Sequence, residues 1–75
     1  MKAPNYTGEE VLAIRKKLRM NQMEFWWPLG ITQSGGSRYE SGRNIPKTVQ
    51  KLLAIAYGTE KQSAAVVEAL RKRDA

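Results

Sequence analysis

The 75-residue sequence contains no cysteine and no histidine. Their absence excludes disulfides, thiol nucleophiles, imidazole acid-base catalysis and the usual zinc ligands. Only seven acidic residues are present, and none of them has a partner at a spacing typical of a metal site or a glycosidase pair. A chain of this length buries only about two thirds of its unfolded surface, so an active-site cavity would compete with the core. We therefore expect a binding module without catalytic residues, cofactor or metal.

Long apolar runs are also missing, since no stretch approaches the roughly 20 apolar residues that a membrane-spanning helix requires. The N-terminus shows no secretion leader, so we expect a cytoplasmic protein. Thirteen Lys and Arg residues give the chain a net charge of +6, and such a positive field favours polyanions. Nucleic acid is therefore a better candidate partner than a membrane surface.

The first helix is predicted from near Gly8 to about Arg19, because Thr7 and Glu10 stand at the spacing of a capping box. Its core face is predicted to consist of Val11, Ile14 and Leu18. The basic residues near its end are Arg15, Lys16, Lys17 and Arg19. Two interpretations of this cluster stay open, because positive charge there suits the helix dipole and also suits contact with phosphates.

The middle of the chain predicts two short helices joined by a glycine turn. Asn21 with Glu24 can form a second capping box, and Gly30 supplies the turn. Thr32 can cap the next helix, which carries small and hydrogen-bonding side chains and ends at Gly42. Such a surface suits close approach to the major groove of DNA, which carries hydrogen-bond donors and acceptors.

The C-terminal part predicts two further helices. Pro46 suits the first position of one, Gly58 ends it, and Thr59 with Gln62 can cap the last. Their predicted core positions are Val49, Leu52, Leu53, Ala56, Val66, Val67 and Leu70. The predicted fold is all-α, with five helices in a single domain of residues 1–75, in which residues 1–6 form a flexible tail and residues 59–75 the C-terminal helix.

From about Thr7 to Gly58 the sequence resembles the Cro/C1-type (XRE-family) helix-turn-helix DNA-binding domain, which has a lambda-repressor-like fold. In that family a polar residue and Gln open the second helix, a Gly makes the turn, and a Thr-Gln start leads to a Ser-Arg-aromatic-Glu end. The matching residues here are Asn21, Gln22, Glu24, Phe25, Gly30, Thr32-Gln33-Ser34, Ser37-Arg38-Tyr39-Glu40-Ser41-Gly42 and the loop Arg43-Asn44-Ile45-Pro46.

The resemblance implies a DNA-binding site on the third helix and the loop after it. Four residues are then expected to face the DNA groove, namely Gln33, Ser34, Ser37 and Arg38. Thr32 is expected near the edge of the groove. The resemblance also implies that DNA phosphates are contacted by Gln22, Arg43 and Asn44. The chemistry agrees, since Gln pairs bidentately with adenine and Arg with guanine. Plainer roles stay open: Thr32 as a helix cap, Arg38 as a bridge to a carboxylate, and Ser37 as a solvated residue.

Some residues depart from the family pattern. Gly36 stands where a buried Val or Ile is usual and Trp26 where Ala is usual, so we hypothesise that the indole fills the space that the glycine leaves. The alternative is that Gly35 and Gly36 let the helix approach DNA or a partner more closely. Pro28 should shorten or kink its helix. Trp27 is expected to cover the edge of the core, or alternatively to bind a partner.

These observations predict a sequence-specific, double-stranded DNA-binding transcriptional regulator, most simply a repressor that occupies its operator. A single small domain makes few base contacts, so we expect a homodimer on a palindromic operator. The C-terminal helix and Tyr57 are its expected dimer surface. The alternative is a protein-protein interaction module, such as the antitoxin of a toxin-antitoxin pair, in which Trp27 or the last helix grips another protein. An enzyme is not expected.

Overall fold

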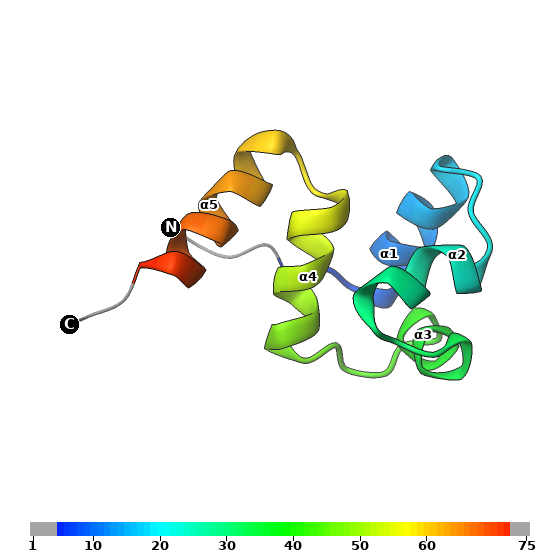
Figure 1. Ribbon diagram of the computed structural model, residues 1–75. Coiled ribbons are helices and arrows are strands. Elements are labelled where there is room, and N and C mark those ends of the chain that lie inside the picture. The colour runs from blue at the N-terminus through cyan, green and yellow to red at the C-terminus, as the bar shows by residue number, and fades with distance from the viewer. Residues whose placement is uncertain (1–4, 73–75) are drawn as a thin grey trace. The chain divides into compact units, whose positions relative to one another are not determined.

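The computed structural model describes residues 5–72, and within them the chain is helical and contains no strand (Figure 1). The elements are α1 (Gly8–Lys17), α2 (Gln22–Trp26), the 3₁₀ helix η1 (Trp27–Leu29), α3 (Gln33–Glu40), α4 (Lys47–Tyr57) and α5 (Glu60–Arg71). The all-α prediction with five α-helices is confirmed. Most of the predicted N-terminal tail, residues 1–4, and the end of the predicted last helix, residues 73–75, lie outside the described residues.

Helix α1 begins at the predicted capping box. The Glu10 amide donates to the Thr7 hydroxyl at 3.1 Å, and the Thr7 amide donates to the Glu10 carboxylate at 3.0 Å. The helix ends at Lys17, earlier than predicted, because Arg19 adopts the left-handed conformation with φ of 57°. Leu18 is therefore the C-cap and is 47% exposed. Its predicted place in the core is wrong.

A second capping box opens α2, where the Glu24 amide donates to the Asn21 side chain at 2.8 Å. The α-helix ends at Trp26, and the chain continues as η1 around Pro28. Pro28 has no amide hydrogen, so it cannot continue the α-helical hydrogen-bond pattern. Gly30 then makes the turn with φ of 77°, a conformation that costs glycine little. The predicted shortening and the predicted glycine turn are both confirmed.

Residues Tyr6–Pro46 form one compact unit that contains α1, α2, η1 and α3. Its buried apolar side chains are Val11, Phe25, Trp26 and Ile45. The rings of Phe25 and Trp26 meet edge to face, with their centroids 5.1 Å apart, an arrangement that aromatic pairs prefer. Ile14, which was predicted in the core, is only half-buried, and so are the large side chains of Leu29, Ile31 and Tyr39.

The second compact unit contains α4 and α5, which pack against each other. Helix α4 begins at Lys47, one residue later than predicted, and Pro46 precedes it. The predicted capping box at the start of α5 is confirmed, since the Gln62 amide donates to the Thr59 hydroxyl at 3.1 Å. The hydroxyl of Ser63 on α5 donates to the Ile55 carbonyl of α4 at 3.0 Å.

The buried stripe of this unit differs in part from the prediction. The buried residues are Val49, Gln50, Leu53, Ala54 and Val66. Ala56 was expected in the core because it lies three residues after Leu53 and seven after Val49, but it is exposed near the end of α4. Leu70, expected in the core, is 50% exposed near the end of α5.

Candidate nucleic-acid interface

An open hollow of about 360 Å³ lies on the surface of the unit that contains α2 and α3. Its lining consists of Gln22, Ser34, Ser37, Gln33 and Arg38. Every one of these residues was predicted from the sequence to contact DNA. Four of them come from α3 and one from the first turn of α2, so the structure brings together residues that lie up to 16 positions apart, from Gln22 to Arg38.

Helix α3 presents its polar side chains outward and its glycine inward. Gln33, Ser34 and Arg38 are exposed and Ser37 is half-buried, whereas Gly36 is buried. Positions three and four apart share one face of an α-helix, so Ser34, Ser37 and Arg38 fall together on the face that lines the hollow. This face offers amide, hydroxyl and guanidinium groups, which are the groups that read base edges.

The buried side of α3 rests on the indole of Trp26. This side chain has no exposed surface, and a Cβ atom placed on Gly36 would collide with three atoms of its indole ring. The hypothesis that a large residue on α2 compensates for a small one on α3 is therefore confirmed. Gly36 serves the contact between the two helices, so the alternative of a closer approach to DNA stays open only for half-exposed Gly35.

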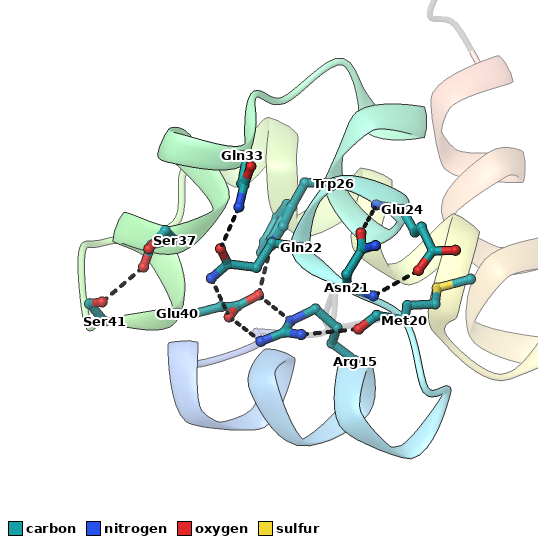
Figure 2. A network of polar contacts seen from close by, with 10 residues as sticks. All are labelled: Arg15, Met20, Asn21, Gln22, Glu24, Trp26, Gln33, Ser37, Glu40 and Ser41. Atoms are coloured by element: carbon teal, nitrogen blue, oxygen red, sulfur yellow. Dashed lines mark hydrogen bonds and ion pairs between the residues drawn. The ribbon is translucent and has the colours of Figure 1, made fainter.

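The carboxylate of Glu40, the last residue of α3, is almost completely buried with 4% exposure and accepts four N–H groups (Figure 2). Arg15 donates through Nε at 2.8 Å and through Nη2 at 3.0 Å. The Trp26 indole donates at 2.8 Å and the Gln22 amide at 3.1 Å. Arg15 also donates to the Met20 carbonyl at 3.0 Å. One carboxylate thus joins α1, α2 and α3.

The electrostatics of Glu40 follow from this arrangement. Burial raises the pKa of its carboxyl group, but the hydrogen bonds from Arg15, Trp26 and Gln22 and the charge of Arg15 together outweigh burial, so the pKa lies below its ordinary value of 4.5. Within residues 5–72 no buried polar side-chain atom lacks a hydrogen-bond partner. The carboxylate is therefore ionised at neutral pH and fully satisfied.

Gln22 lies between the buried carboxylate and the surface hollow. A carboxylate only accepts hydrogen bonds, so the Gln22 Nε2 must face Glu40 and the Oε1 must face away. That oxygen accepts the amide of Gln33 at 3.5 Å, the long limit of a hydrogen bond (Figure 2). Gln22 was predicted to hold a phosphate. The structure shows that one of its amide hydrogens is used inside the protein, while the residue still lines the hollow.

The remaining predicted contact residues lie outside the hollow. The hydroxyl of Thr32 accepts the Gly35 amide at 3.1 Å, so its capping role is present. Arg43 and Asn44 are exposed in the loop that follows α3. The plainer role considered for Arg38 is not observed, because within the described residues 5–72 no ion pair joins its guanidinium to a carboxylate.

Trp27 is 67% exposed, and Met23 one turn earlier is 57% exposed. The interpretation that Trp27 covers the edge of the core is wrong. Successive residues of a helix point about 100° apart. Phe25 and Trp26 both face the core, and Trp27, about 200° around from Phe25, faces the solvent. The outer face of α2 and η1 therefore carries two adjacent large apolar side chains.

Sequence reasoning missed the network around Glu40. It considered Arg15 as a helix-dipole or phosphate-contacting residue, whereas the structure places it in an ion pair. One signal was present in the sequence, because a carboxylate in the last turn of a helix is opposed by the helix dipole and so calls for a cationic partner. The Trp26 indole N–H left no signal beyond the unusual position of the residue.

The part of the chain that the structure describes has no cluster of three or more His, Cys, Asp or Glu side chains suited to a metal ion. It also has no helix both long and apolar enough to span a lipid bilayer. No feature of residues 5–72 thus points to a metal ligand set or to a membrane span.

The model of one protein family, described as the RsaL-like HTH domain, matches residues 12–56. This match covers more than half of the chain and includes α2, η1 and α3. Searches of curated proteins and of solved structures found no match. The predicted helix-turn-helix DNA-binding domain is confirmed by the family match and by the helical structure. The chain belongs to the RsaL-like HTH domain family.

Proposed function

We propose that this protein is a sequence-specific transcriptional regulator that binds double-stranded DNA with α3 in the major groove. The observation that carries the proposal is the hollow beside α3, which is lined by the same polar side chains that the sequence indicates as DNA contacts. The net charge of +6 supports it, because a basic domain gains affinity from the phosphate backbone.

Two side chains are proposed to read bases directly. Gln33 donates one amide hydrogen toward Gln22, which leaves its oxygen and its second amide hydrogen for the paired acceptor and donor of adenine in the major groove. Arg38 is exposed and lines the same hollow, and its guanidinium suits the two acceptors of guanine. Ser34 and Ser37 add hydroxyl groups between these two readers.

Other residues are proposed to fix the position of the domain on the phosphate backbone. Arg43 and Asn44 are exposed directly after α3, where a cation and an amide can contact phosphates on either side of the groove. Thr32 at the start of α3 and Gln22 at the start of α2 complete the proposed set. These contacts add affinity and carry no base preference of their own.

A dimeric repressor of the Cro/C1 type is the finer form of this proposal. One α3 helix reads only a few base pairs, so a symmetric dimer on a palindrome with half-sites about one helical turn apart gives adequate specificity. Tyr57 and α5 are the proposed dimer surface, and exposed Leu70 on α5 supports this choice. The dimer would repress transcription in the cytoplasm by occupying its operator.

A second candidate function is that of a protein-binding module such as an antitoxin. The exposed pair of Trp27 and Met23 favours it, since large apolar side chains side by side on a surface are often partner contacts. The two functions predict different results in binding experiments at high salt. A second chain that co-purifies in high salt supports the module, whereas retention on DNA that weakens with salt supports the regulator.

Selection of bound sequences from random duplexes tests the proposal. We expect a recovered motif with two inverted half-sites that contain adenine and guanine positions. Recovery of unrelated sequences, or no retention of duplex DNA at low salt, would contradict sequence-specific binding. A single half-site without inversion would contradict only the dimer on a palindrome.

Alanine variants then separate base readers from phosphate contacts. Gln33→Ala and Arg38→Ala should each cost roughly 1 to 3 kcal/mol on the selected duplex and far less on random DNA. Arg43→Ala should weaken both duplexes alike and lower the salt slope by about one. Circular dichroism serves as the control for folding. Equal losses on both duplexes for Gln33→Ala would make this residue a phosphate contact.

A further inference from the structure

The indole N–H of Trp26 connects the buried contact between α2 and α3 to the polar hollow. Its 2.8 Å hydrogen bond ends on Oε2 of Glu40, which also accepts Nε of Arg15. The other carboxylate oxygen, Oε1, accepts Nη2 of Arg15 and Nε2 of Gln22. Each oxygen therefore receives two donors, and the carboxylate has no freedom to rotate without losing contacts.

The chain of contacts continues to the surface. Glu40 fixes which end of the Gln22 amide faces inward, and the outward oxygen of Gln22 lies 3.5 Å from the amide nitrogen of Gln33 (Figure 2). A series of hydrogen bonds thus runs from the indole through the carboxylate and Gln22 to Gln33. A buried network with every member satisfied holds its side chains in one arrangement.

We propose that Trp26 is a positioning residue for base reading, which acts through Glu40 and Gln22 on the orientation of the Gln33 amide. The proposal rests on the proposed function, since Gln33 must read a base for its orientation to matter. The indole ring fills the space over Gly36, and the N–H has the separate task of holding the carboxylate. These two roles predict different consequences for ring removal and for N–H removal.

An isosteric replacement separates the two roles. In a Trp27→Phe background Trp26 is the sole tryptophan, and biosynthetic incorporation of 3-benzothienylalanine then replaces its N–H by sulfur while keeping the ring shape. Trp26→Phe is the genetically encoded counterpart, with a smaller ring. The parent Trp27→Phe protein is the matched control, because position 27 is exposed and its side chain lies outside the network.

Two readouts are measured on the native chain, the parent and the N–H-free protein. The first is the NMR signal of the Gln22 side-chain amide, which should shift when Glu40 loses the indole donor. The second is the ratio of affinities for the selected duplex and for a duplex changed at the base pair that Gln33 reads. We expect this ratio to fall roughly 3- to 10-fold, the worth of one hydrogen bond, with affinity for random DNA unchanged.

The outcomes distinguish the inference from the proposed function. If the native protein does not discriminate between duplexes, the proposed function fails. If it discriminates and the N–H-free protein keeps the same ratio, the positioning role of Trp26 is overturned while the proposed function stands. An equal loss of affinity for the selected and the random duplex also overturns the positioning role, and so does an unchanged NMR signal of the Gln22 amide. In either case the N–H of Trp26 would serve folding alone.

Discussion

Trp26 and Trp27 are adjacent and chemically identical, yet the first has no exposed surface and the second is 67% exposed. The glycines of α3 form a similar pair. A Cβ on Gly36 would collide with the indole, whereas a Cβ on Gly35 would lie 3.3 Å from side-chain atoms of Ile31 and Thr32. In each pair one residue belongs to the contact between α2 and α3, and its neighbour belongs to an outer face.

This difference shows that a single contact defines the relation between the two helices. The indole of Trp26 takes the volume that the missing side chain of Gly36 leaves, and its N–H is bound by Glu40 at the end of α3. The outer neighbours have no comparable task within the unit. The same amino acid thus serves packing and polar positioning at one position and presents an apolar surface at the next.

Removing the two indoles in turn should give the largest contrast. Trp26→Ala leaves a large cavity and an orphaned contact on Glu40, so we expect a loss of about 3 to 5 kcal/mol in the free energy of unfolding. Trp27→Ala should stay within about 0.5 kcal/mol of the native protein. Urea unfolding followed by circular dichroism measures both. Similar losses for the two variants would show that Trp27 also contributes to packing.

The two glycines provide the second contrast. Gly36→Ala forces a methyl group into the indole, and we expect overpacking to cost about 1 to 3 kcal/mol. Gly35→Ala gains helix propensity, but its methyl group would lie 3.3 Å from Ile31 Cγ2 and Thr32 Oγ1, which must move by a few tenths of an ångström. These two effects oppose each other, so the net change should lie within about 1 kcal/mol. Thermal unfolding of both variants checks this. A stable Gly36→Ala protein would mean that the indole can shift without cost.

Acid should weaken the contact between the helices. The pKa of Glu40 in the folded protein is lowered below 4.5, so the unfolded chain binds this proton first as the pH falls. The stabilisation is present above pH 4.5 and is lost as the pH falls through the folded pKa. Carbon NMR titration of the Glu40 carboxyl group measures that pKa. A midpoint at or above 4.5 would contradict the hydrogen-bond network around it.

The smallest expected effect is spectroscopic, and of the two variants that test it only Trp27→Phe should leave stability almost unchanged. Trp27→Phe retains only the buried indole, which should emit at short wavelength and resist quenching by acrylamide. Trp26→Phe retains only the exposed indole, which should be quenched readily wherever the protein remains folded. Equal quenching of the two single-tryptophan proteins would contradict the opposite environments of these residues.

Local interactions explain why much of this protein follows from its sequence. The capping boxes at Thr7, Asn21 and Thr59 were predicted because both partners lie three residues apart. The turn at Gly30 and the shortened helix at Pro28 follow from backbone chemistry that does not depend on distant residues. These signals place α2 and α3 and therefore most of the hollow.

The tertiary structure decided which side chains meet across the helices. The partners of Glu40 lie 14, 18 and 25 residues away, and no local pattern specifies such pairs. Sequence reasoning therefore considered Arg15 only as a helix-dipole or phosphate-contacting residue. It also expected Trp27 to cover the edge of the core and Leu18 to lie within the core. Which side of a helix is buried depends on how the neighbouring helices pack against it. The network that positions Gln22 and Gln33 therefore forms only once α1, α2 and α3 have packed together.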